Sequence, residues 1–494
     1  SGTVRAFEPN GKELHGWPVH TKRLQAFGTG KYGYGRGHAY KRGAIPPADE
    51  PILTPVAAGD LDGDGSPEII ASSTNGSVYA WHADGSLVHG YPVVLGAKDH
   101  SLSVPPPHAE FTRLPSQGIF AVPVLGDLNG DGQLEIVQAA FDGKIHALEP
   151  DGTELDGWPV TETIPASLGP PGYAYVQDHK LAATPALADL NGDGSLEVVE
   201  RSQESFSPGS GLQFGGDVFL DAFYGDGTKH SGGAEVSGWP VSFPSIVEFY
   251  GSAQDYLTEG AESPVAADVD GDGSDEIAFS PWLSPTYLVR GNGSIVGTYG
   301  PIPGTDPAAP VSFTMMGAFG QFGPAPTLAY LTGGVGGDSV AHLLSPGKAA
   351  PITDYVRAYG ALTQQPLPNF PQRSMGIAFF GEPDIADVTG DGNTEVLQGG
   401  DTSTLDAFGA TGMAPEGWPK FTGGWLFAAP AIGDLNGDGK VEVVATTREG
   451  YLFVWDTPGL ASANDQWWHT RHDEYNSGNY GTTTNLSPAS SPAP

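Results

Sequence analysis

Short runs of apolar and polar residues, separated by turns, recur along the whole chain. In each unit a small-and-apolar run leads into an acidic loop, and a run rich in Val and Ile follows. A two-residue turn such as Asn75-Gly76 then leads to an alternating segment such as SVYAWH. A second turn, such as Asp84-Gly85, precedes a closing segment ending GYPV, GWPV or GWPK. This pattern predicts four antiparallel strands and no helix in each unit.

The acidic phrase that joins the first two predicted strands occurs six times. The copies are AAGDLDGDGSPEIIASS from Ala57, VLGDLNGDGQLEIVQAA from Val124, ALADLNGDGSLEVVE from Ala186, VAADVDGDGSDEIAFS from Val265, DIADVTGDGNTEVLQGG from Asp384 and AIGDLNGDGKVEVVATT from Ala431. Their irregular spacing, 47 to 119 residues, indicates one structural unit repeated with inserts of variable length. A seventh, degenerate copy, GAFGQFGPAPTLAYLTGG from Gly317, lacks the aspartates.

Seven repeats of a four-stranded unit predict an all-β fold, a seven-bladed β-propeller, with eight blades as the alternative. We expect residues 1–481 to form this single domain, with repeats beginning near residues 56, 123, 185, 264, 315, 384 and 430. The segment SGTVRAFEPNGKELHGWPV matches only the last two strands of a unit, so residues 1–19 predict a half blade. The ring must then combine the two chain ends or leave that half blade. Residues 482–494, rich in Ser, Thr and Pro, are expected to be a linker or tail.

Oxygen-bearing side chains stand at positions 1, 3, 5 and 9 of each complete acidic loop, and the backbone carbonyl of position 7 is a further candidate donor. A hard cation that takes six to eight oxygen ligands needs such a set, and the loops contain no soft or imidazole ligand. We therefore predict about six calcium ions. The predicted ligands are Asp60, Asp62, Asp64, Ser66, Glu68; Asp127, Asn129, Asp131, Gln133, Glu135; Asp189, Asn191, Asp193, Ser195, Glu197; Asp268, Asp270, Asp272, Ser274, Glu276; Asp387, Thr389, Asp391, Asn393, Glu395; and Asp434, Asn436, Asp438, Lys440, Glu442.

These phrases resemble the FG-GAP or VCBS repeats of integrin α-subunit-like and bacterial surface propellers. The resemblance covers nearly all of residues 1–480 and implies that the acidic loop between the first two strands of a blade binds calcium. The blade around Gly317 lacks carboxylates and is expected to be empty, and Thr389 is a weaker donor than aspartate. The ending DQWWHTRHDEYNSGNYG also resembles the closing segment of bacterial secreted members.

The charge balance narrows the possible partners. With 22 Lys and Arg against 58 Asp and Glu, the formal charge of −36 argues against nucleic acid or an anionic membrane as a general partner. No apolar run approaches the roughly 20 residues of a membrane-spanning helix, and the sequence resembles a mature or trimmed soluble product. Because open calcium loops fill only where calcium is abundant, we expect an extracellular, secreted or cell-surface protein.

Long inserts between units offer candidate ligand-binding residues. They span residues 20–54, 94–120, 161–183, 242–263 and 299–314, and should lie on the face opposite the calcium loops. The first insert contains basic and aromatic side chains suited to an anionic or sugar ligand. These are Lys31, Tyr32, Tyr34, Arg36, His38, Tyr40, Lys41 and Arg42. The alternative is that this insert packs against the protein's own acidic surface.

Two classes of function remain open. The first is a surface adhesion, ligand-binding or scaffold module for a protein or glycan. A glycan-binding lectin is a special case of this first class. The second class is an enzyme, a calcium-dependent polysaccharide lyase. No known catalytic motif is present, which favours the non-enzymatic class. The aromatic residues of the GWP and GYP segments, Trp17, Tyr91, Trp158, Trp239 and Trp418, are interpreted as wedges between blades.

Overall fold

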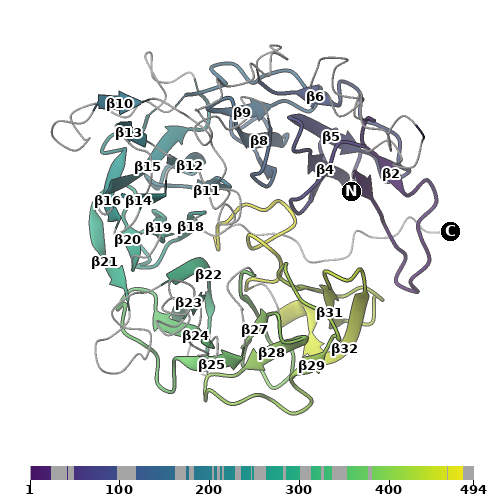
Figure 1. Cartoon of the computed structure of the whole chain (residues 1–494), viewed down its shortest axis with the longest axis vertical. Coiled ribbons are helices and arrows are strands. Elements are labelled where there is room, and N and C mark those ends of the chain that lie inside the picture. The colour runs from purple at the N-terminus through teal and green to yellow at the C-terminus, as the bar shows by residue number, and fades with distance from the viewer. Residues whose placement is uncertain are drawn as a thin grey trace.

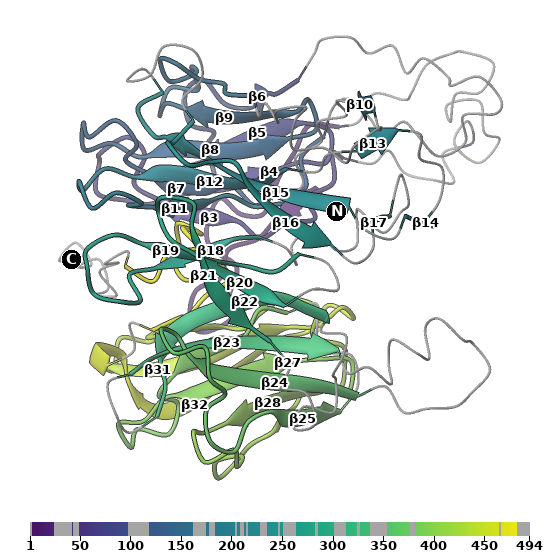
Figure 2. The same cartoon turned by 90° about the vertical axis from the view of Figure 1, so that its left-hand side faces the viewer.

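A computed structural model shows an all-β chain whose antiparallel sheets stand side by side in a ring (Figure 1). In the side view of Figure 2 the strands run from one face of the ring to the other. The structure describes residues 2–23, 42, 49–96, 118–161, 174–176, 183–202, 205–207, 212–213, 216–227, 235–245, 248–249, 263–281, 285–300, 313–323, 327–335, 353–375, 381–463 and 466–481. None of the described segments forms a helix that could cross a membrane.

Each of the seven repeats opens a sheet of its own. The first three sheets are β3 (Ala57–Gly59), β4 (Glu68–Ser72), β5 (Ser77–Trp81), β6 (Val93–Val94); β7 (Val124–Gly126), β8 (Glu135–Ala140), β9 (Lys144–Leu148); and β11 (Ala186–Ala188), β12 (Glu197–Ser202), β15 (Gly216–Tyr224), β16 (Val241–Ser245). The fourth and fifth are β18 (Val265–Ala267), β19 (Glu276–Phe279), β20 (Thr286–Val289), β21 (Ile295–Tyr299); and β22 (Phe313–Gln321), β23 (Leu328–Val335), β24 (Thr353–Gly360), β25 (Gln372–Met375). The sixth and seventh are β26 (Asp384–Ala386), β27 (Glu395–Gly399), β28 (Thr404–Phe408), β29 (Lys420–Phe421); and β30 (Ala431–Gly433), β31 (Lys440–Thr446), β32 (Leu452–Leu460).

The remaining strands form small two-stranded sheets. At the N-terminus β1 (Thr3–Val4) pairs with β2 (Val19–His20), as expected for a half blade. Two further pairs are β10 (Ala174–Val176) with β13 (Ser205–Ser207), and β14 (Leu212–Gln213) with β17 (Glu248–Phe249). A 3-10 turn, η3 (Ala461–Ala463), follows β32.

The prediction of four strands per unit holds for five of the seven repeat sheets. In the β7–β9 sheet the fourth position is reduced to an isolated bridge between Ile145 and Val160. The β30–β32 sheet has three strands, because the chain leaves β32 for the centre of the ring instead of turning back. The degenerate repeat near Gly317 nevertheless forms a complete sheet, β22–β25.

The core lies between neighbouring sheets. On the first sheet Ile70, Val78 and Ala80 are fully buried against Leu125 and Ile136 of the second. Gly59 leaves the space that this packing needs, because a Cβ there would lie 2.7 Å from Leu125 Cδ1. The indole of Trp158 donates from Nε1 to the carbonyl of Gly225 in the next sheet at 2.9 Å. The structure therefore places this GWP aromatic at a sheet junction, as the wedge interpretation expects.

Residues 466–481, which we call the axial segment, lie in the centre of the ring. Its backbone exchanges hydrogen bonds with the first strand of six of the seven repeat sheets. The pairs are Trp467 with Ile385, Trp468 with Ile432, Glu474 with Ala58, Tyr475 with Leu125, Ser477 with Leu187, and Gly478 and Tyr480 with Ala266. The seventh is reached by a side chain, since Gln466 Oε1 accepts from the Gln321 N–H at 2.6 Å. This segment therefore ties together sheets that lie far apart in sequence.

Candidate metal centres

Each acidic loop connects the first and second strand of its sheet, as predicted. The position 9 glutamate lies in the second strand and is buried in all six copies; Glu68, Glu135, Glu197, Glu276 and Glu395 each begin that strand. By contrast, all six position 5 aspartates are exposed: Asp64, Asp131, Asp193, Asp272, Asp391 and Asp438. Each loop therefore has a buried glutamate at its base and exposed aspartates at its solvent-facing side.

One oxygen of the position 9 glutamate holds the loop closed. In every copy Oε2 accepts the backbone N–H of the position 2 residue, at 2.7 to 3.1 Å. In three loops the other oxygen, Oε1, accepts from the position 3 asparagine; Asn191 donates to Glu197 at 3.1 Å and Asn436 to Glu442 at 3.0 Å. The glutamate is thus oriented with Oε1 toward the polar side chains of the loop.

The position 1 aspartate is the centre around which the backbone turns. In the second sheet Asp127 Oδ1 accepts from the N–H of Gly130 at 2.7 Å, and Oδ2 accepts from that of Gly132 at 2.9 Å. Gly130 and Gly132 have φ of 76° and 86°, values that L residues rarely adopt. Glycines at positions 4 and 6 are therefore what lets the loop wind around one carboxylate.

Carboxylates converge in these loops. Ligand atoms of Asp60, Asp62 and Asp64 lie within 4.8 Å of one another, and the same holds for Asp268, Asp270 and Glu276. Burial raises the pKa of Glu135, Glu276 and Glu395 to about 7, and neighbouring loop aspartates add to the effect. Like charges held this close favour the binding of a cation, and carboxylate oxygens suit a hard divalent ion.

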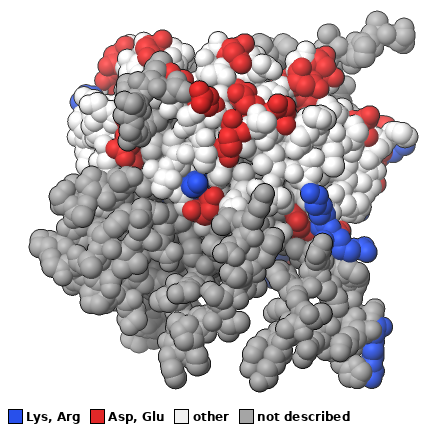
Figure 3. Space-filling model, turned by 90° about the horizontal axis from the view of Figure 1, so that it is seen from above, with Lys and Arg blue, Asp and Glu red and all other residues white. Residues whose placement is uncertain are grey.

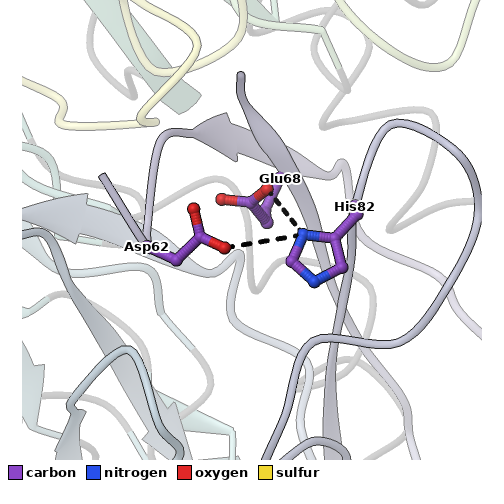
Figure 4. A group of neighbouring side chains, drawn as sticks. All are labelled: Asp62, Glu68 and His82. Atoms are coloured by element: carbon purple, nitrogen blue, oxygen red, sulfur yellow. Dashed lines mark hydrogen bonds and ion pairs between the residues drawn. The ribbon is translucent and has the colours of Figure 1, made fainter. Parts of the chain in front are cut away.

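The residue that follows the third strand lies beside the acidic loop in several sheets. The sequence analysis did not identify this residue as part of the site. In Figure 4 the His82 ring points at the first loop, with Nδ1 3.0 Å from Glu68 Oε1 and 3.8 Å from Asp62 Oδ2. Glu149 groups with Asp131 and Glu135 in the same way. The available signal was positional, because both residues immediately precede the turn before the closing segment.

The six loops are therefore not equivalent. At the same position the fourth sheet has Arg290, whose Nη2 lies 3.9 Å from Asp270 Oδ2. A guanidinium competes with a bound cation, whereas the extra carboxylate of Glu149 would assist one. The loop of the degenerate sheet, residues 322–327, contains no acidic residue.

The loops share one side of the molecule. In Figure 3, where the ring is seen from its rim, the acidic side chains of the described residues gather toward one side. Of the basic and aromatic candidates in the first insert, only Arg42 lies within the described residues, and it is exposed. Lys31, Tyr32, Tyr34, Arg36, His38, Tyr40 and Lys41 lie outside them.

Comparison with known proteins gives a family match for part of the chain. Residues 60–138 match the model of the FG-GAP-like repeat. No curated protein is similar enough in sequence to count as a relative. Similar solved structures include the V. cholerae biofilm matrix protein Bap1, 13% identical, covering 85% of this chain and 90% of that one, with a TM-score of 0.39.

Two other solved structures are comparably distant. The exotype rhamnogalacturonan lyase YesX is 15% identical, covering 96% of this chain and 82% of that one, with a TM-score of 0.42. The Dos1 propeller is 11% identical, covering 79% and 75%, with a TM-score of 0.41. Six acidic strand-loop-strand repeats and sheets arranged in a ring make this chain a β-propeller, in which residues 60–138 match the FG-GAP-like repeat.

Proposed function

We propose that the six acidic loops bind calcium and that the protein is an extracellular, calcium-stabilised binding or scaffold module. The observation that carries this proposal is the convergence of three carboxylates within 4.8 Å in a loop wound around its first aspartate. In the first loop Asp60, Asp62, Asp64 and Glu68 would supply side-chain oxygens, and Ser66 its carbonyl. The same positions would serve in the other five loops.

Calcium suits these loops better than magnesium does. Calcium accepts six to eight oxygens in irregular geometry, whereas magnesium requires a near-ideal octahedron. Most position 3 and 5 ligands are exposed, which is typical of weaker sites that fill at the high calcium concentrations outside cells. This argument supports a secreted or cell-surface location.

The proposed binding role rests on the separation of acidic and basic side chains on the protein surface. Acidic loops occupy one face, and a protein with a formal charge of −36 repels acidic ligands except at a local basic patch. We infer that a protein or glycan partner binds on the face opposite the loops, with the basic segment of the first insert as the candidate contact.

Calcium content tests the metal proposal. In equilibrium dialysis against buffer that contains about 1 mM calcium, we expect six calcium ions per chain, and five in Asp127→Asn, because the amide removes the charge around which the second loop winds. Asp151→Asn is the matched control, since it removes a carboxylate on an exposed turn of the same sheet and should leave six ions. Two or fewer ions in the wild-type protein would overturn the proposal.

Chelation tests the stabilising role. One site held at 100 times its dissociation constant adds about 2.7 kcal/mol to the free energy of unfolding, so six sites should raise the melting temperature strongly. An unchanged melting curve in excess chelator would contradict this role. Screening against glycans and uronate polymers, with ultraviolet detection of unsaturated product, then separates binding from lyase activity; we expect binding without product.

A further inference from the structure

We propose that the ring has an eighth position, formed between β30–β32 and β1–β2, which binds one β-hairpin of the chain's own repeat type. The hairpin would consist of a first and a second strand joined by an acidic loop. We call this position the notch. The inference rests on packing alone and is independent of whether the loops bind calcium.

The N-terminal pair already occupies the outer part of such a position. Trp17 donates from Nε1 to the carbonyl of Ala83 in the first sheet at 2.9 Å, as Trp158 and Trp239 do to Gly225 and Gly291 across two other sheet junctions. The pair β1–β2 therefore neighbours the first sheet in the way one repeat sheet neighbours the next. It supplies only the third and fourth strands, since its sheet has two strands.

The facing surface of the last repeat sheet is uncovered. In the register of the first sheet, Val444, Leu452 and Val454 correspond to Ile70, Val78 and Ala80. Those three first-sheet residues are 0% exposed, whereas Leu452 and Val454 are each 48% exposed and Val444 is partly exposed. The position 2 residue follows the same trend, with Leu435 41% exposed and its equivalent Leu61 fully buried.

The space at Gly433 indicates which kind of side chain would fit against this surface. Gly59 and Gly126 end the first strands of two sheets, and an added Cβ there would lie 2.7 Å and 2.4 Å from a leucine of the next sheet, Leu125 or Leu187. The equivalent Gly433 has nothing within 4 Å. The notch thus preserves the space into which the central leucine or isoleucine of another first strand would fit.

On the other side of the notch, the first sheet also has apolar residues that no neighbouring sheet covers fully. Ala58 and Ile69 of the first sheet are partly exposed, although their equivalents in the second sheet, Leu125 and Ile136, are 1% and 0% exposed. Among the six hydrophobic clusters of described residues, none joins β30–β32 to β1–β2. Both walls therefore expose apolar surface where other sheet junctions bury it.

The axial segment takes a longer step at the same position. Its contacts advance from one sheet to the next in one or two residues, as from Trp467 to Trp468 or from Glu474 to Tyr475. Between the last sheet and the first, the contacts advance from Trp468 to Glu474, a step of six residues. Residues 468–472 within this step form a turn, in which the Trp468 N–H donates to the His472 carbonyl.

Register also shows how a hairpin would join the pair. Thr3 and Val4 pair with His20 and Val19 as Ser77 and Val78 pair with Val94 and Val93. Gly2 thus corresponds to Gly76, the last residue of the turn between the second and third strands of the first sheet. A hairpin fused ahead of Ser1 would enter the notch without a linker.

The test fuses a copy of residues 124–141 ahead of Ser1, which keeps three residues between the second and third strands, and compares melting temperature and amide hydrogen exchange with those of the unfused chain. We expect the fusion to raise the melting temperature by several degrees and to slow exchange in β31 and β32, because burial of the exposed face removes apolar surface from water. The same changes should appear in metal-free buffer, although smaller, which separates this inference from the calcium proposal.

Two matched variants identify the contact. In the fused copy, the substitution corresponding to Leu125→Asp should abolish both effects, because a carboxylate would enter an apolar space. In the body of the protein, Gly433→Leu should leave the unfused chain folded, since a Cβ there meets no atom within 4 Å, but should cancel the effects of the fusion.

Two results would overturn the inference. One is a fused hairpin that changes neither the melting temperature nor exchange in β31 and β32. The other is a concentration-dependent dimer of the unfused chain that protects the same amides in sedimentation and exchange measurements. A second copy would then cover this face, and the notch would be a dimer interface.

Discussion

Asn476 offers a sharp test of whether the axial segment holds the ring together. Its side chain is fully buried, and Nδ2 donates to the carbonyls of Val56 at 3.1 Å and Pro123 at 3.0 Å. These carbonyls precede the first strands of two neighbouring sheets. Asn476 also has φ of 56°, a conformation that asparagine tolerates better than most residues. One amide therefore links two sheets from the centre.

Substitutions separate the hydrogen bonds from the backbone conformation. Asn476→Gly keeps the positive φ but leaves two buried carbonyls without their donor, at about 1–3 kcal/mol each. Asn476→Ala adds about 1 kcal/mol of left-handed strain. The entropy of unfolding is about 2.1 cal/mol/K per residue, so for a chain of this length 1 kcal/mol lowers the melting temperature by about 1 °C. We expect losses of about 2–6 °C for glycine and about 1 °C more for alanine.

Calorimetry at fixed calcium concentration measures these shifts. Asn369 is the matched control, because it is an exposed asparagine with φ of 68°, and Asn369→Ala should show only the strain. If Asn476→Gly melts within about 1 °C of the wild-type protein, the axial hydrogen bonds do not hold the neighbouring sheets, and the structural role assigned to this segment is wrong.

Two further predictions concern pH. His146 is buried, which lowers its pKa, but the hydrogen bonds that its ring donates to Asp142 and Glu154 outweigh burial and raise the pKa to about 9. The charged form of His146 stabilises the fold by at most about 3 kcal/mol, and this contribution is fully present below pH 6.5. It should disappear as the pH rises from 6.5 to 9. If the melting temperature of His146→Gln had the same pH dependence as that of the wild-type protein, the assignment would be wrong. Because the pKa of metal-free Glu135 is about 7, calcium binding should release protons near pH 7 and none near pH 9, and the metal-free protein should lose stability as pH rises from about 4.5 to 7. Titration calorimetry in buffers of different ionisation enthalpy measures the release, and buffer-independent heats at pH 7 would exclude it.

Local features of this protein could be predicted from the sequence alone. The six acidic loops, the strands on either side of them and the half blade at residues 1–19 all follow from short-range patterns. In Asp127-Leu-Asn-Gly-Asp-Gly, for instance, the aspartate accepts N–H groups only three to five residues away, and two glycines supply the positive φ. Contacts of this range are encoded within one repeat, and six copies make the pattern unmistakable.

The tertiary structure decided how these units are joined. Asn476 and Val56 are 420 residues apart in sequence, and the axial segment carries no repeat that could indicate its contacts. His82 approaches Asp62 only because sheet pairing brings the end of the third strand beside the loop. The exposed face around Gly433 has the same apolar pattern as its buried equivalents, so only the absence of a neighbouring sheet distinguishes it. Such features depend on which surfaces meet across the ring, and no local pattern of residues contains that information.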